Sequence, residues 1–339
     1  MHNFKKAFIA SLSFLLCFVL LFAIVVYPAF SKDSLYNDSG KRAELAGSTE
    51  LIICGASHAL GGFIPDIIDE ELGVKSYNLS SYAASFEGKR WLIEKELERN
   101  NVKTFVLEIS HDTIRDYSSD RSTGEPMTVM KLDSFGERLR YSAKNIGFTD
   151  LDKVGSVMLR YGLNAWKAKL SGQLNIPQTN RGYIPNKTLD LGTDAGLIAD
   201  LYHSNHINTD FDAESLMHIE AIAGLCKEKG CRFVIAVVPV SDQVIMSFDN
   251  VDEFVAKLGN FCAERGYEFY DFNMLKNRTE LFDDSDCYFD SSHLGPKGAE
   301  AFSHAFAQVM MAAEKGEDTS RFFADSFAEL EEQILAKYN

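Results

Sequence analysis

The sequence predicts an α/β protein built as a three-layer α/β/α sandwich, with about five parallel strands between two layers of helices. Three observations lead to this prediction. Short, almost wholly apolar runs of strand length recur along the chain. Segments with apolar residues at helical spacing separate these runs. The runs are apolar at successive positions, as in parallel sheets that are covered on both faces.

The strands and helices of this domain alternate along residues 49–316. The predicted strands are residues 50–54, 74–79, 104–109, 232–239 and 268–272. The predicted helices are residues 63–72, 86–100, 213–229, 251–265 and the segment from residue 296 onward. Because a single helix separates most successive strands, the strands are expected to run parallel.

The N-terminal segment predicts a membrane anchor. Residues 7–30 are almost entirely apolar, and Lys5 and Lys6 precede them. About two dozen residues at about 1.5 Å each cross a hydrocarbon layer of about 30 Å, whereas the apolar run of a signal sequence is about 7–15 residues. We expect an uncleaved anchor over residues 1–30, with its N-terminus in the cytoplasm and the rest of the chain outside. The alternative is a cleaved signal with a small-residue site near Ala29 and Ser31.

Three further segments flank or interrupt the domain. Residues 31–48 are polar and are interpreted as a stalk. Residues 112–208 lack the strand–helix alternation and predict an inserted subdomain or lid near the carboxyl edge of the sheet. Residues 112–181 contain eleven Lys and Arg and eight Asp and Glu, so this segment is basic in an acidic chain. The positive charge could attract an anionic polymer, and a solvated surface of mixed charge explains it equally well. Residues 317–339 predict an amphipathic C-terminal helix.

Charge and cysteine content narrow the function classes. The chain of 339 residues has a formal net charge of −15, which argues against a nucleic-acid partner because a phosphate backbone would be repelled. The chain has six cysteines, and Cys17 lies in the anchor. The other five face the oxidising compartment outside the membrane, and this odd number leaves at least one thiol free unless two chains are linked. Cys226 and Cys231 bracket a predicted turn and are candidates for a disulfide. The spacing of the Cys and His residues matches no metal site, and we expect no metal or organic cofactor.

Near the C-terminal end, a carboxylate and an imidazole lie three residues apart. Asp290 and His293 occupy a short polar loop directly before the last predicted helix of the domain. An Asp at this spacing can accept the Nδ1 proton of the His and leave Nε2 free to take a proton from a nucleophile. The alternative is a loop Asp that caps the helix beside a solvated His.

A nucleophile for this pair follows the first predicted strand. Ser57, in Gly55-Ala-Ser57-His, lies at a strand-to-helix turn, where its hydroxyl is exposed and the first helical amides can meet an oxyanion. The alternative is that Ser57 only caps the helix. Both loops follow strands of a parallel sheet, whose carboxyl ends form one edge, so they are expected to meet.

At these residues the chain resembles the SGNH (GDSL) hydrolase superfamily, which has a flavodoxin-like α/β/α fold. Gly55-Ala-Ser57 matches its first block and Asp290-Ser-Ser-His293 its last. The second block resembles residues 77–80, with Ser80 where the family has an oxyanion-hole Gly. The third resembles residues 110–112, with His111 where the family has Asn. The resemblance covers about residues 48–110 and 213–312.

The resemblance implies a Ser57–His293–Asp290 triad, with the amides of Ser57 and Ser80, and His111 as a further donor, around the oxyanion. The anchor and the run from Phe289 to Ser303 look most like extracytoplasmic members that take part in polysaccharide O-acetylation and teichoic-acid D-alanylation. This implies an esterase or O-acyltransferase that acts on an envelope polymer, beside other envelope-modification proteins. The two altered blocks leave a second hypothesis, a membrane-tethered binding or assembly protein with little or no catalysis.

Overall fold

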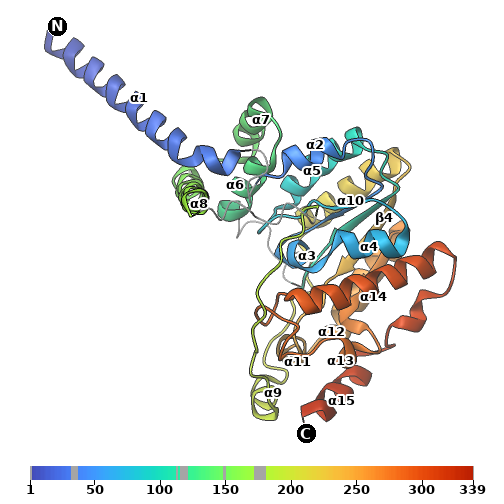
Figure 1. Ribbon diagram of the computed structural model, residues 1–339. Coiled ribbons are helices and arrows are strands. Elements are labelled where there is room, and N and C mark those ends of the chain that lie inside the picture. Colours follow the sequence, from blue (N-terminus) through green and yellow to red (C-terminus); the bar gives the residue numbers. More distant parts are fainter. Residues whose placement is uncertain are drawn as a thin grey trace. The chain divides into compact units, whose positions relative to one another are not determined.

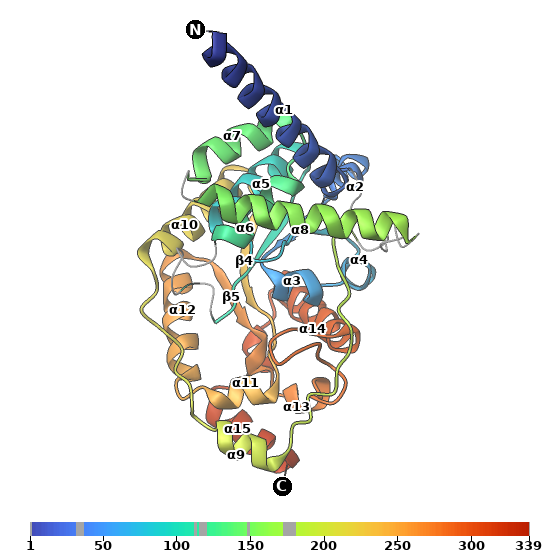
Figure 2. The same cartoon turned by 90° about the vertical axis from the view of Figure 1, so that its left-hand side faces the viewer.

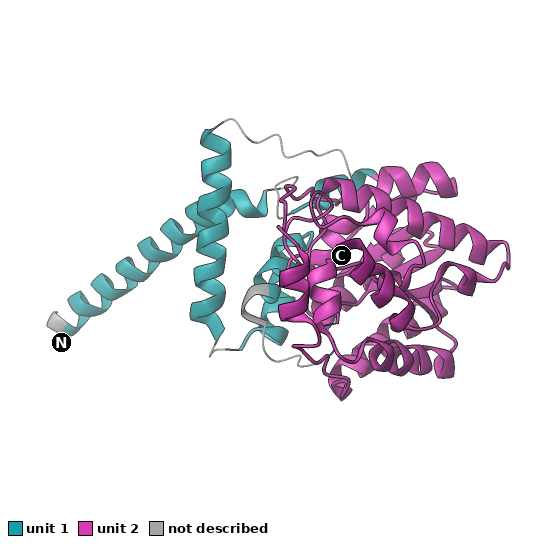
Figure 3. Cartoon of the chain, turned by 90° about the horizontal axis from the view of Figure 1, so that it is seen from below, with its two compact units in different colours: residues 1–44, 122–178 teal, residues 45–121, 179–339 magenta. Residues whose placement is uncertain are grey.

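The computed structural model describes residues 2–31, 37–111, 114, 121–147, 150–171 and 181–338. The chain forms two compact units, shown in teal and magenta in Figure 3. Unit 1 comprises residues 1–44 and 122–178, and unit 2 comprises residues 45–121 and 179–339. Each unit is described by itself below.

Unit 2 is built on a five-stranded parallel sheet. Its strands are β1 (Leu51–Cys54), β2 (Ser76–Asn78), β3 (Thr104–Glu108), β4 (Arg232–Val237) and β5 (Glu268–Asp271). They lie in the order β2-β1-β3-β4-β5, and every adjacent pair is parallel. The strand order reverses direction between β1 and β3, which is the position where open α/β sheets bind ligands.

Helices cover both faces of this sheet (Figures 1 and 2). One layer contains α3 (Ser57–Gly62), α4 (Pro65–Leu72) and α14 (Pro296–Glu314). The other contains α5 (Phe86–Arg99), α10 (Ala213–Glu228) and α12 (Val251–Arg265). The fold class predicted from the sequence, a three-layer sandwich with five parallel strands, is confirmed.

The core beneath α14 is rich in aromatic side chains. Phe63, Phe272, Phe302 and Phe306 are fully buried, and their rings meet mainly edge to face. Each such pair adds about 0.5–1.5 kcal/mol beyond the burial of its area. This cluster fixes α14, and with it the loop that precedes α14, against the sheet.

Shorter helices complete unit 2. They are α9 (Ala195–Leu201), α11 (Asp242–Ser247), η2 (Phe272–Met274), α13 (Arg278–Leu281), η3 (Thr319–Phe322) and α15 (Phe327–Tyr338). The predicted C-terminal helix is therefore shorter than residues 317–339, because η3 and a bend precede α15. The apolar side of α15 is buried at Phe327, Leu330 and Ile334.

Unit 1 consists of helices. They are α1 (His2–Phe30), α2 (Ser39–Glu44), α6 (Arg121–Lys131, whose first residue belongs to unit 2), α7 (Phe135–Asn145) and α8 (Leu151–Leu170). By length and composition α1 is able to cross a membrane as a single span, and a signal sequence would pass the same test. Its described side chains are almost all exposed up to residue 25.

The structure divides the predicted stalk and insertion differently from the sequence pattern. The described part of the stalk contains α2, whose Arg42 is buried and forms ion pairs with Asp38 and Asp133. Lys131 also pairs with Asp38, at 3.1 Å, so this polar segment is tied into unit 1 by charges rather than by apolar residues. The insertion is split, since residues 122–178 belong to unit 1 and residues 179–208 to unit 2. Residues 32–36, 112–113, 115–120, 148–149 and 172–180 lie outside the described residues.

The cysteine pair suggested by the sequence is not bonded. Cys226 and Cys231 are both buried free thiols. The turn between them is closed instead by a hydrogen bond of 2.8 Å from the Cys231 N–H to the Cys226 carbonyl.

Candidate active site

The structure brings two loops together at the carboxyl edge of the sheet. Ser57 is the first residue of α3 and follows β1 after two residues. Asp290 and His293 lie in the loop before α14. An antiparallel bridge between Tyr288 and Leu294 closes the base of this loop, and a hydrogen bond of 2.8 Å from the Phe289 N–H to the His293 carbonyl closes its tip. The loop is therefore short and held at both ends.

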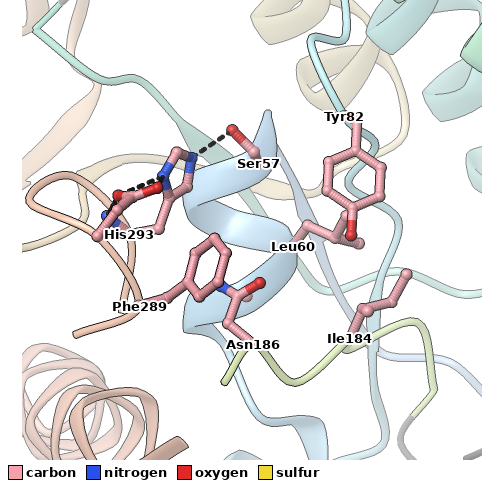
Figure 4. A pocket seen from close by; sticks show the side chains of 9 residues that line it. Ser57, Leu60, Tyr82, Ile184, Asn186, Phe289 and His293 are labelled. Carbon is pink, nitrogen blue, oxygen red and sulfur yellow. Dashed lines mark hydrogen bonds and ion pairs between the residues drawn. The ribbon is translucent and has the colours of Figure 1, made fainter. Parts of the chain in front are cut away.

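Ser57, His293 and Asp290 form a continuous chain of hydrogen bonds (Figure 4). Ser57 Oγ lies 2.8 Å from His293 Nε2. On the other side of the ring, His293 Nδ1 lies 2.8 Å from Asp290 Oδ1 and 3.0 Å from Oδ2. This is the geometry in which Asp290 fixes the tautomer of His293 and leaves Nε2 able to accept the proton of Ser57.

Asp290 is held as an anion by its own loop. Its Oδ1 also accepts the backbone N–H groups of Ser292 at 2.9 Å and of His293 at 2.8 Å. Partial burial raises the pKa of this carboxyl, but the hydrogen bonds from His293 and from the two amides outweigh burial and place its pKa below the ordinary value. Asp290 is therefore charged near neutral pH and can stabilise an imidazolium.

The turn that carries Ser57 is packed against a buried carboxyl at the end of β3. Glu108 Oε2 accepts the N–H of Ala56 at 2.9 Å. A Cβ placed on Gly55 would lie 2.3 Å from the same Oε2 and 2.7 Å from the Cβ of Ala59. Gly55 is therefore required by this close approach of β1, α3 and Glu108, and not by a left-handed backbone.

Glu108 lies in an apolar environment with one buried cation. Its side chain is fully buried, and burial raises the pKa of its carboxyl. Lys89 of α5 is also fully buried, and burial lowers the pKa of its ammonium. The attraction between the two groups opposes both shifts. Glu108 thus supports the nucleophile turn through the Ala56 N–H, and neither group belongs to the hydrogen-bond chain of Ser57, His293 and Asp290.

A second imidazole lies against the first. The rings of His58 and His293 are stacked, with centroids 4.5 Å apart and planes inclined by 14°. Burial, followed by the repulsion of a charged His293, lowers the pKa of His58 to about 3. His58 is therefore neutral near pH 7 and acts as a flat wall that holds the plane of the His293 ring.

The hydroxyl of Ser57 opens into a small pocket of about 200 Å³. Most of its lining is apolar, and Asn186 adds an amide; Figure 4 shows the lining residues Ser57, Leu60, Gly61, Tyr82, Ile184, Asn186, Phe289, Asp290 and His293. Drug-sized ligands occupy pockets of about 300–1,000 Å³. The pocket suits a group of only a few carbon atoms.

Two residues expected near the oxyanion do not line this pocket. Ser80 is fully buried, and its backbone N–H donates to Asn78 Oδ1 at 3.2 Å. The ring of His111 packs between Phe248 and Phe254, and its Nε2 lies 4.0 Å from Asp271 Oδ2. Asp112, the last residue of the same sequence block, lies outside the described residues.

The sequence did not single out six of the nine lining residues as site residues, namely Leu60, Gly61, Tyr82, Ile184, Asn186 and Phe289. Phe289 is adjacent to Asp290, so the motif itself could have indicated it. Ile184 and Asn186 lie on a segment, residues 181–191, that runs along the site. The Ile184 N–H donates to the Leu60 carbonyl at 3.1 Å, and Asn186 Nδ2 donates to the Leu294 carbonyl at 3.0 Å. In the sequence, only the predicted lid over residues 112–208 indicated that this segment could lie near the site.

The comparisons with known proteins find a likeness among solved structures. No family model matches the chain. No curated protein matches it either. Among solved structures, the chain is similar to a protein from Bacteroides fragilis described as a candidate acylhydrolase, with 9% identity over 84% of this chain and 98% of that chain, and a TM-score of 0.39. What the site can do therefore follows from its own residues.

Proposed function

We propose that the chain is a serine-dependent enzyme of acyl esters, an SGNH-type esterase or O-acyltransferase. The observation that supports it most strongly is the hydrogen-bond chain from Ser57 Oγ through His293 to Asp290, with contacts of 2.8 Å on each side of the ring. A helix-capping Ser and a solvated His would not require this alignment. A carboxylate that holds the imidazole and a hydroxyl within reach of Nε2 define an activated nucleophile.

In the proposed mechanism, His293 Nε2 removes the proton of Ser57 as Oγ attacks the ester carbonyl. Asp290 stabilises the imidazolium that forms. Ser57 is the first residue of α3, so its N–H has no acceptor within the helix and can donate to the oxyanion. His293 then protonates the leaving alkoxide, which leaves an acyl-Ser57. Attack by water or by an acceptor hydroxyl, with His293 as base, releases the acyl group.

The pocket supports a short acyl group as the substrate. Its volume of about 200 Å³ and its apolar walls, Leu60, Ile184 and Phe289, favour a short acyl chain over a long fatty acyl chain. The side chain of Asp290 is 46% exposed and that of His293 is 24% exposed, so one side of the triad is open to solvent. This opening allows an alcohol carried on a polymer to approach.

We further propose that the enzyme acts outside the cell membrane on an acylated or acyl-accepting envelope polymer. Support comes from α1, which is long and apolar enough to anchor the chain, and from the resemblance of the anchor and of residues 289–303 to extracytoplasmic members of the superfamily. The competing hypothesis is a tethered binding or assembly protein. It is favoured by the contacts of Ser80 and His111, since the Ser80 N–H donates to Asn78 Oδ1 and the His111 ring packs against Phe254.

A fluorophosphonate probe separates the enzyme from the binding protein. The full-length chain in detergent should be labelled, and Ser57→Ala should abolish the labelling while thermal unfolding stays unchanged. The binding-protein hypothesis predicts no labelling of the folded native chain. Short and long p-nitrophenyl esters then test the pocket, since acetate should react faster than octanoate.

The fate of the acyl group separates an esterase from a transferase. An acetyl ester is incubated with the enzyme at increasing concentrations of a polysaccharide acceptor, and acetylated polymer is measured beside free acetate. A transferase shifts product from acetate to polymer as the acceptor increases. If acyl groups go only to water at every acceptor concentration, the transferase proposal is wrong.

A further inference from the structure

Exposed apolar side chains are concentrated in unit 1. Outside α1, the described residues include nine large hydrophobic side chains that are exposed. Six of them belong to this unit: Phe135, Leu139, Leu151, Leu159, Leu163 and Leu170. Four of the six lie on the single helix α8. A cluster of this kind indicates a surface that something apolar covers.

The exposed side of α8 has an apolar stripe with a basic stripe beside it. At 3.6 residues per turn, Leu159, Leu163 and Leu170 fall within about 40° of one another around the helix. Lys153, Arg160 and Lys167 recur every seven residues and form a second row, about 80° from the leucines. An apolar face with lysine and arginine along its margin is typical of helices that lie in a membrane interface.

Helix α8 runs across the C-terminal part of α1, as Figure 2 shows. Trp166 Nε1 donates to the Ile24 carbonyl at 3.1 Å. At Gly162 the two backbones approach so closely that a Cβ would lie 2.4 Å from the Val25 carbonyl oxygen. The crossing is therefore a specific contact within one unit, and it fixes α8 to a definite level of α1.

That level matches the edge of a bilayer. The uninterrupted apolar run begins at Ala7, after Lys5 and Lys6, and the candidate span ends at Phe30. Tyr27 lies about 20 residues beyond Ala7, or about 30 Å along the helix, which is the thickness of the hydrocarbon core, and Ile24 lies about one turn before Tyr27. Trp166 and the exposed Tyr27 lie at the same end of α1, and both residue types favour the interface. A helix that crosses α1 at this point would lie along the headgroup layer.

We propose that α8 lies in the headgroup layer of the membrane that α1 spans, with Leu159, Leu163 and Leu170 inserted toward the acyl chains and the basic row on anionic headgroups. Charge supports an anionic surface, because residues 122–178 carry eight Lys and Arg against five Asp and Glu in a chain of net −15. The proposal rests on α1 remaining in the membrane, as proposed above. The occupant of the apolar stripe is lipid, not a second protein.

The test uses the full-length chain in nanodiscs with an environment-sensitive fluorophore on a single cysteine. Cys17→Ser removes the exposed thiol, and the other five cysteines are buried. Leu163→Cys places the label on the apolar stripe. Asn164→Cys is the matched control, since it is also exposed but lies about 100° away around the helix. All variants must retain the thermal stability of the native chain.

In nanodiscs that contain phosphatidylglycerol, acyl-brominated lipids should quench the label at position 163 by about half, because interfacial helices insert roughly 5–10 Å. The label at position 164 should change little. Replacing Lys153, Arg160 and Lys167 with Gln should reduce the quenching at position 163 in anionic discs. Equal quenching at positions 163 and 164, or a label at position 163 that is exposed to water, would overturn the proposal.

Two further outcomes are separable. A label at position 163 that is shielded from water but not quenched by brominated lipid means that protein covers the stripe, which also overturns the proposal. A label on the native Cys17 reports on α1 alone, and its quenching shows that α1 is in the bilayer whatever α8 does. If the label on Cys17 is not quenched, the anchor proposal fails, and the proposal for α8 fails with it.

Discussion

Gly55→Ala should inactivate the enzyme without removing any group of the triad. The new methyl group would lie 2.3 Å from Glu108 Oε2, 2.6 Å from Glu108 Cβ and 2.7 Å from Ala59 Cβ. A different rotamer of Glu108 relieves the first contact only, because the two Cβ atoms belong to the backbone frame of β3 and α3. Carbon atoms prefer about 3.5–4.0 Å, so the turn must shift by about 1 Å.

A shift of this size acts directly on Ser57, two residues further along. A misplacement of about 1 Å reduces catalysis by about 10²-fold. Overpacking also lowers the free energy of unfolding by about 1–3 kcal/mol. The rate of fluorophosphonate labelling and kcat/KM for an acetyl ester measure the first effect, and urea unfolding measures the second.

The matched control is Gly224→Ala in α10, where a Cβ would meet nothing within 4 Å. Ala is favoured over Gly inside a helix by about 1 kcal/mol, so this variant should be as stable as the native chain or more so, with unchanged activity. Activity of Gly55→Ala within about twofold of the native enzyme would refute the reasoning. It would mean that the turn accommodates a methyl group between Glu108 and Ala59 without displacing Ser57.

Three other substitutions test the remaining groups. Asp290→Asn should lower kcat by roughly 10²–10⁴-fold. The loss should be similar at about pH 6 and about pH 8, because the lowered pKa of Asp290 keeps the native carboxyl ionised at both values. A loss confined to one of these pH values would contradict the assignment. His58→Phe keeps a flat ring against His293 and should leave the pH profile of kcat unchanged, since His58 is neutral; a shifted acid limb would show that it carries charge. Asn186→Ala removes the donor to the Leu294 carbonyl and should lower the free energy of unfolding by about 0.5–1.5 kcal/mol. The same substitution should raise KM more than it lowers kcat. An unchanged KM would exclude Asn186 from substrate binding.

The sheet and the three linked groups could be predicted because each depends on short-range pattern. Buried parallel strands are apolar at successive positions, so β1 and β3 to β5 were located to within a residue or two. The three-residue spacing of Asp290 and His293 fits one turn of a short loop, and only Gly55 and Ala56 separate Ser57 from a strand. Parallel topology then requires the two loops to share one edge of the sheet.

The surroundings of the triad depend on contacts between distant segments, which local pattern does not specify. Glu108 is a strand-end acid whose role follows only from the pairing of β3 with β1. The direction of His111 is decided by Asp271 and Phe254, which are more than 140 residues away in the chain. Asn186 enters the site because its segment returns from the insertion along α3.

The segment of residues 181–191 has a consequence for how acyl selectivity can change. Backbone hydrogen bonds hold this segment against the domain at both ends. At its start, the Asn78 N–H donates to the Arg181 carbonyl at 2.9 Å. At its end, the Leu189 N–H donates to the Tyr288 carbonyl, and the Leu191 N–H donates to the Asp284 carbonyl. Only its side chains at Ile184 and Asn186 reach the pocket. A substitution at Ile184 can reshape the pocket while the backbone of the catalytic loop stays fixed, whereas Asn186 also holds that loop through the Leu294 carbonyl. Selectivity for the acyl group is thus structurally separable from the acid–base chemistry at position 184, and a small library at this position is the direct route to altering it.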